Sequence, residues 1–212
     1  RVAYLMLTGV QPSQILLATF TNKAAREMLS RVETLTGGDG LGLRPSALPS
    51  AAPPDGVGPA SVAGSIWGGT FHAIGNRLLR QHAPRIGRQP NYSILDEEDQ
   101  RDLHKLCVTE LQIRVEAKRF PSPAVIGELI SFAFNAQLPL TQIVEARAPH
   151  FAEWATQLLD VARRYEAKKR AANAVDYDDL LGSWLKLLEE HPELARRLGG
   201  SFRALLVDEY QD

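Results

Sequence analysis

Two acidic residues, Asp208 and Glu209, directly follow an apolar run in the segment RALLVDEYQD, residues 203–212. The run ALLV predicts a buried strand, and ligands of open α/β sheets bind at the carboxyl ends of strands. An acid pair placed there can hold Mg²⁺ through Asp208, while Glu209 orients and deprotonates a water molecule that attacks a bound γ-phosphate. The alternative is a solvated loop, because the ends of strands are commonly polar.

Two earlier segments also end an apolar run on an aromatic residue and polar neighbours. ILLATF, residues 15–20, is typical of a strand that is buried on both faces, which implies a parallel sheet. Thr21 and Asn22 supply capping side chains, and KAAREMLSRVETL, residues 23–35, predicts a helix. Its expected apolar face comprises Ala24, Met28, Val32 and Leu35. Strand, turn and helix in this order form half of a βαβ unit.

The same order returns later in the chain. SIWGGTFH, residues 65–72, predicts a strand, and AIGNRLLRQHA, residues 73–83, predicts a helix. Between the two pairs, 23 of the 33 residues 37–69 are Gly, Pro, Ala or Ser, which is typical of a flexible loop. No GxGxxG pattern occurs there, so this loop is not expected to bind phosphates.

From Asp96 onward, the sequence has the pattern of amphipathic helices. We expect helices over residues 96–111, 122–137 and 151–171. One face of the third helix is apolar at spacings of three and four, comprising Phe151, Trp154, Leu158, Ala162 and Tyr165. A basic cluster ends that helix: Arg163, Arg164, Lys168, Lys169 and Arg170. Cations near a helix C-terminus are favourable by themselves, so we interpret this cluster as structural rather than as a nucleic-acid contact.

A second acidic group, VDYDDLL at residues 175–181, precedes another predicted helix. Its acids, Asp176, Asp178 and Asp179, are most simply an N-terminal helix cap. They lack the glycine and the terminal glutamate of an EF-hand loop.

Composition narrows the class of protein. The chain has 212 residues, 44% hydrophobic and 23% charged, with a net charge of −1, values typical of a globular domain. The apolar runs are far shorter than the ~18 residues of a membrane-spanning helix, so we expect no membrane association. A single cysteine, Cys107, and no secretion signal indicate a cytoplasmic setting. Residues 1–95 carry 9 Lys/Arg against 4 Asp/Glu, a basic excess that suits a polyanionic partner but is also within ordinary scatter.

Four segments taken in order, TFTNKAAREM, GTFHAIGNRLLR, VDYDDLL and LLVDEYQD, closely resemble the superfamily 1 DNA helicases of the UvrD/Rep type. The resemblance covers the whole chain. It implies an α/β fold with the parallel sheet of a RecA-like P-loop NTPase, interrupted by an all-helical subdomain. The expected division is RecA-like over residues 1–95 with the flexible insert 37–69, helical over 96–174, and RecA-like again over 175–212.

The same resemblance assigns roles to single residues. Asp208 is implied as the Mg²⁺ ligand of bound ATP, Glu209 as the general base, and Gln211 as the residue that senses the γ-phosphate, all within the Walker B motif. Single-stranded DNA is expected to stack on an aromatic ring and to contact neighbouring polar groups. The implied DNA contacts are Phe20, Thr21, Asn22, Lys23, Thr70, Phe71 and His72. Their alternative is structural: Phe20 and Phe71 as core residues at strand ends and His72 as a hydrogen-bonded histidine.

The function implied is ATP-dependent 3′ to 5′ translocation on single-stranded DNA, with unwinding at single/double-strand junctions. A phosphate loop, GxxxxGK followed by Ser or Thr, is missing from the 212 residues. We therefore expect an internal fragment that neither hydrolyses ATP nor unwinds DNA by itself. The insert 37–69 also looks longer than is usual in this family. A recombination-type helicase-nuclease subunit and a non-catalytic DNA-binding module remain as alternatives.

Overall fold

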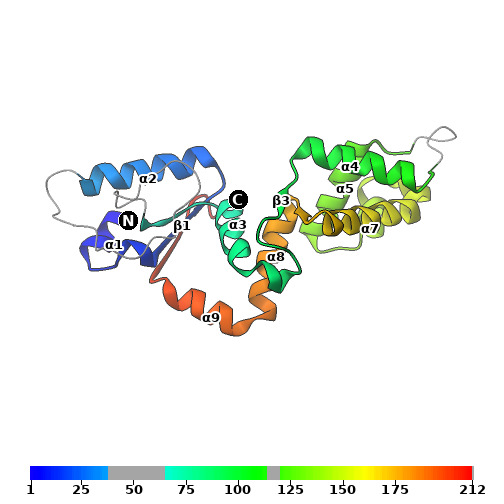
Figure 1. The fold of residues 1–212 in the computed structure, drawn as a ribbon. Coiled ribbons are helices and arrows are strands. Elements are labelled where there is room, and N and C mark those ends of the chain that lie inside the picture. Colours follow the sequence, from blue (N-terminus) through cyan, green and yellow to red (C-terminus); the bar gives the residue numbers. More distant parts are fainter. Residues whose placement is uncertain (38–64, 114–119, 212) are drawn as a thin grey trace. The chain divides into compact units, whose positions relative to one another are not determined.

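The computed structural model describes residues 1–37, 65–113 and 120–211. Most of the predicted flexible insert 37–69 lies outside these ranges. The chain forms two compact units, one comprising Arg1–Leu78 and Trp184–Asp212, the other Leu79–Ser183. The second unit is thus inserted in the sequence of the first (Figure 1).

A three-stranded parallel sheet forms the centre of the first unit. Its strands are β1 (Ile15–Thr19), β2 (Trp67–Thr70) and β5 (Ala204–Val207), in the order β2-β1-β5. The register pairs Thr19 with Thr70 and Ala18 with Val207. All five residues of β1 are buried, as the continuous apolar run predicts for a central parallel strand. The expected α/β fold with a parallel sheet is confirmed.

Helices cover both faces of this sheet (Figure 1). Ile15 and Leu17 of β1 pack on one face against α1 (Val2–Leu7) and α2 (Asn22–Gly37). Leu16 and Ala18 pack on the other face against α3, the second half of α8 and α9. These three helices span Phe71–His82, Tyr177–Glu190 and Pro192–Ser201, and a short 3₁₀ turn, η1, spans Pro12–Gln14.

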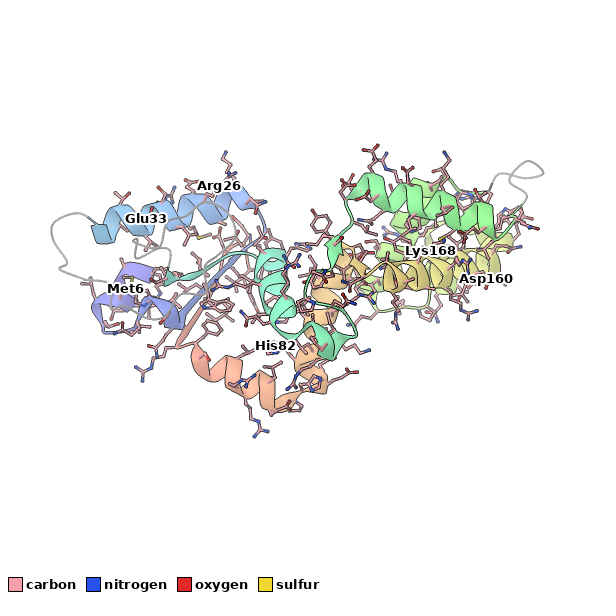
Figure 2. The ribbon with its side chains drawn as sticks, in the orientation of Figure 1. Met6, Arg26, Glu33, His82, Asp160 and Lys168 are labelled. Carbon is pink, nitrogen blue, oxygen red and sulfur yellow. The ribbon has the colours of Figure 1, made fainter. Side chains whose placement is uncertain are left out.

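The buried face of α2 is rotated from the predicted one. Ala25 and Val32 are buried and Leu29 packs in the same core, whereas Leu35 is 63% exposed. The observed stripe at residues 25, 28, 29 and 32 keeps helical spacing, but it ends a turn earlier than the sequence indicates. The outer face carries charged side chains, including Arg26 (Figure 2).

The prediction that ALLV is a buried strand is wrong for β5. Leu205 is 66% exposed, and Ala204, Leu206 and Val207 are only partly buried. Within the described sheet, β5 pairs with β1 alone and forms an edge. An edge strand has a neighbour on one side only, so its apolar sequence does not ensure burial.

The second unit is built mainly from helices. Its core joins α4, α5, α6 and α7 through buried residues such as Ile126, Val144, Leu158 and Val161. Phe151, Trp154, Leu158, Ala162 and Tyr165, the predicted apolar face, all belong to this core. The elements are α4 (Glu97–Glu110), α5 (Pro123–Ala136), α6 (Leu140–Arg147), η4 (Pro149–Trp154) and α7 (Ala155–Ala171).

Two short parallel strands lie beside the helices, β3 (Ser93–Ile94) and β4 (Ala174–Val175). Their pairing ties the chain before α4 to the chain after α7. Arg80 adds hydrogen bonds to the Pro90 and Tyr92 carbonyls, so the segment after α3, including η3 (Ala83–Ile86), joins the helical unit. The two compact units meet along the chain at Leu78/Leu79 and Ser183/Trp184, and the division of domains at 95/96 and 174/175 stays a prediction.

No single helix in the described part of the chain is long and apolar enough to cross a membrane. Taken together, α5 and α6 would be long and apolar enough to cross a membrane, but the chain bends by 115° between them. Ile126, Leu129, Ile143 and Val144 of this pair are buried in the core of the helical unit. Their apolar character is thus accounted for by packing.

Candidate functional site

The predicted site residues gather at one edge of the sheet in the first unit. All three strands are parallel, so the segments that follow β1, β2 and β5 leave the sheet at the same end. The Asp208 amide donates a hydrogen bond to the Ala18 carbonyl at 3.0 Å, which continues the ladder one residue beyond β5. The acid pair therefore lies next to the segment that begins with Phe20.

The acid pair has the donor atoms that a hard cation requires. Asp208 is partly buried, and no other side chain in the described ranges forms a hydrogen bond or ion pair with its carboxylate. Glu209 is exposed, with its backbone in the left-handed region at φ 53°. The Gln211 side-chain amide donates a hydrogen bond to the Glu209 carboxylate. Oxygen ligands of this kind fit Mg²⁺, with Asp208 as the residue that would hold it.

Phe20 and Phe71 form one aromatic pair. Their ring centroids are 5.3 Å apart and the ring planes are inclined by 56°. Phe20 is 50% exposed, whereas Phe71 is partly buried against the core beneath α3. The two segments that resemble separate DNA contacts thus meet in a single aromatic surface. A ring that is half exposed and supported from behind can stack on a base.

Polar groups follow Phe20 directly at the start of α2. Thr21 caps the helix, since its hydroxyl accepts a hydrogen bond from the Ala24 amide at 3.1 Å. Asn22 and Lys23 are exposed in the first turn. A helix N-terminus favours anions through its amide groups and dipole, and Lys23 adds a positive charge. This arrangement suits a phosphate next to a stacked base.

Thr70 and His72 have different environments. Thr70 is only 8% exposed, and its hydroxyl accepts a hydrogen bond from the Ala73 amide at 3.1 Å. The structure thus gives Thr70 a capping role at the start of α3. His72 is partly buried. Direct contact of either residue with DNA stays a prediction from the resemblance.

Two acids of VDYDDLL, Asp176 and Asp179, belong to a buried ionic network in the helical unit, whereas Asp178 accepts a hydrogen bond from the Asn135 side-chain amide at 2.9 Å. Lys169 is 1% exposed, and its Nζ lies 2.5 Å from Glu166, 2.7 Å from Asp176 and 2.8 Å from Asp179. Asp176 and Asp179 also accept hydrogen bonds from each other's backbone amides. The predicted capping role is confirmed for this pair. Three carboxylates this close could hold a metal ion, but the Lys169 ammonium fills the space between them.

The network changes the pKa values of its members. Burial alone would lower the pKa of Lys169, but the Asp179, Asp176 and Glu166 carboxylates raise it above its ordinary value. Burial alone would raise the pKa of Asp176, but Lys169 lowers it. Lys169 is therefore charged at neutral pH.

The sequence carried a signal for Lys169 that the basic-cluster interpretation missed. The apolar stripe of α7 runs through Leu158, Ala162 and Tyr165, and the next position at a spacing of four is Lys169. A lysine in line with a buried stripe requires a buried acid as its partner. The structural interpretation is confirmed for two other members of the cluster: Arg164 pairs with Glu110 at 2.8 Å, and Lys168, labelled in Figure 2, pairs with the same carboxylate at 2.6 Å.

His104 stacks on Tyr165 beside this network, with ring centroids 4.2 Å apart. It is 2% exposed, and neither ring nitrogen has a hydrogen-bond partner within the described ranges. Burial is the main cause that lowers the pKa of His104 to about 4; Lys169 acts in the same direction and Asp176 in the opposite one. His104 is therefore neutral in the folded protein above that value.

This histidine predicts a pH-dependent stability of the helical unit. Between pH ~6.5 and ~4 the unfolded chain binds a proton at His104 and the folded chain does not, so the free energy of unfolding should fall by up to about 3 kcal/mol as pH decreases. Urea unfolding at several pH values, for the wild type and His104→Leu, isolates this contribution, because the variant should lose less stability over that range. An NMR titration of His104 with a midpoint near 6.5 would contradict the prediction.

Comparison with known proteins agrees with this arrangement. The whole chain, residues 1–212, matches the family described as UvrD/REP helicase N-terminal domain. It is 35% identical over 214 residues to ATP-dependent DNA helicase UvrD1 of Mycobacterium leprae, covering 100% of this chain and 24% of that protein. It is 34% identical over 213 residues to ATP-dependent DNA helicase PcrA of Bacillus subtilis, covering 100% of this chain and 25% of that protein.

The chain thus spans about a quarter of the length of the curated relatives it matches. The P-loop NTPase fold expected from the sequence is the fold of this family. The family match over all residues of this chain, the parallel sheet and the three motif segments at one sheet edge agree with one another. The chain belongs to the UvrD/REP helicase family.

Proposed function

We propose that this chain supplies the single-stranded DNA surface and the catalytic acids of a longer ATP-dependent DNA helicase. The intact protein would move 3′ to 5′ along single-stranded DNA and unwind the duplex at a single/double-strand junction. The direction and the junction preference rest on the family resemblance. The relatives are named ATP-dependent DNA helicases, which supports ATP use and a DNA substrate.

The observation that carries the proposal is the shared sheet edge. The Phe20–Phe71 pair, the N-terminus of α2 and the acids Asp208 and Glu209 all follow strands of the same sheet. The Asp208 amide is bonded directly to β1. Coupling of ATP hydrolysis to DNA movement requires that the DNA surface and the catalytic acids be linked. Here the base-stacking surface and the acid pair lie at the ends of neighbouring strands.

Each group has a defined task in this proposal. Mg²⁺, when bound, would neutralise part of the negative charge of the phosphates. Asp208 would hold the cation, and Glu209 would accept the proton of the attacking water. Gln211, which donates to Glu209 in this structure, orients that carboxylate and would respond to the γ-phosphate.

Single-stranded DNA binding by the intact protein tests the proposed surface. Phe20→Ala should weaken binding by about 1–3 kcal/mol, because it removes the exposed ring on which a base stacks. Lys23→Ala should instead make the slope of log K against log salt concentration less steep, by about the amount that one phosphate contact contributes. Fluorescence anisotropy with a labelled oligonucleotide across a salt series measures both quantities.

Tyr4→Ala is the matched control. Tyr4 is an aromatic of the same unit that is 61% exposed on α1, outside the segments that follow the strands. Its replacement should leave the affinity and the salt dependence unchanged. Equal losses for Phe20→Ala and Tyr4→Ala, or no loss for Phe20→Ala, would refute the proposed DNA surface.

A further inference from the structure

Thr19 is the last residue of β1, directly before the exposed Phe20, and it is fully buried at 0% exposure. It stands in register with Thr70 of β2. A buried hydroxyl must form a hydrogen bond to offset its lost hydration. The Thr19 Oγ1 donates to the Thr21 carbonyl oxygen at 2.9 Å, across Phe20. The bond therefore closes the turn that carries the aromatic ring.

The Thr21 carbonyl is shared between two elements. It also accepts the hydrogen bond of the Ala25 amide at 3.0 Å, the first backbone bond of α2. The Thr19 hydroxyl thus joins the end of the central strand to the residue that caps the helix. Phe20 lies between these two fixed points, so its backbone is held from both sides.

The same short segment is bonded to the acid pair. The Ala18 carbonyl accepts from the Asp208 amide at 3.0 Å, one residue before Thr19. The path from Asp208 to Phe20 thus consists of one backbone hydrogen bond, the end of β1 and the turn that Thr19 closes. Thr19 itself is too buried to touch DNA or nucleotide.

We propose that Thr19 is a positioning residue that sets the orientation of Phe20 for DNA and fixes it relative to the acid pair. This inference rests on the proposed function, since it requires Phe20 to stack on a base. It also explains why a hydroxyl is present where the other four residues of β1 are apolar. A valine has the same shape and would fill this position. It would leave no acceptor without a hydrogen bond, because the Thr21 carbonyl keeps its bond from the Ala25 amide.

Thr19→Val tests the inference in the intact protein. We expect the Kd for single-stranded DNA to rise about fivefold or more, within the range that stacking on one aromatic ring contributes. Thr19→Ser keeps the hydroxyl and should bind within about twofold of the wild type. Thermal melting should show all variants folded, and Thr19→Ala, which also lacks the hydroxyl, replaces the valine variant if that one does not fold.

A double-mutant cycle shows whether Thr19 acts through Phe20. The double variant Thr19→Val/Phe20→Ala should bind within about twofold of Phe20→Ala alone, because the ring that Thr19 positions is already gone. Additive losses, or wild-type affinity for Thr19→Val when Phe20→Ala is weakened, would overturn the role of Thr19. Wild-type affinity for Phe20→Ala would instead overturn the proposed DNA surface and, with it, this inference.

Discussion

Glu209→Gln is expected to lower ATP turnover of the intact protein by about 10²- to 10⁴-fold, the range that a positioned general base contributes. The amide has the same shape as the carboxylate but cannot accept the proton of the attacking water. It can still take part in the hydrogen bond with Gln211. Folding and single-stranded DNA affinity should therefore be retained, and steady-state ATP hydrolysis with saturating DNA measures the loss.

Glu189→Gln provides the control for the change of charge. Glu189 is exposed on α8 in the same unit and takes part in none of the described ion pairs. ATP turnover of the Glu189→Gln variant should equal that of the wild type. Residues 1–212 by themselves contain no GxxxxGK phosphate loop and are expected to show no DNA-stimulated hydrolysis. Wild-type turnover in Glu209→Gln, or Glu209-dependent hydrolysis by residues 1–212 alone, would contradict the assignment.

The local pattern of apolar residues was sufficient to predict the elements that are buried, such as β1 and the inner face of α7. ILLAT reads as a strand buried on both faces because β1 has a neighbour on each side and helices above and below. The apolar face of α7 follows from helical spacing alone. ALLV has an equally apolar sequence, but the exposure of Leu205 depends on which strands flank β5. Such long-range information is absent from a four-residue pattern.

The site was predictable to a similar extent. Motif resemblance identified Phe20 and Phe71, and parallel topology places both at one sheet edge. Their contact at 5.3 Å depends on the register that pairs Thr19 with Thr70, which the sequence does not state. Thr19 itself was overlooked because a threonine at a strand end has no local signature. Its importance becomes visible only when its burial and its hydrogen-bond partner are known.

The buried network of the helical unit predicts a second large effect, on stability. Lys169→Met should lower the free energy of unfolding of this unit by about 3–5 kcal/mol, because Asp176 and Asp179 would remain buried without their cation. Tyr165 would still donate to Asp176 at 2.9 Å, but one hydroxyl does not neutralise two carboxylates. Amide hydrogen exchange in α7 measures the loss within this unit alone.

Lys168→Met is the matched control on the next residue. The Lys168 side chain is 25% exposed and pairs with the solvent-accessible Glu110, so its removal should cost no more than about 1 kcal/mol. In the Lys169 variant, Asp176→Asn and Asp179→Asn together should recover part of the lost stability, because they remove the unpaired charges. If Lys169→Met cost as little as Lys168→Met, the ionic network would not hold the end of α7 to the start of α8. The acids of VDYDDLL would then be available for another role.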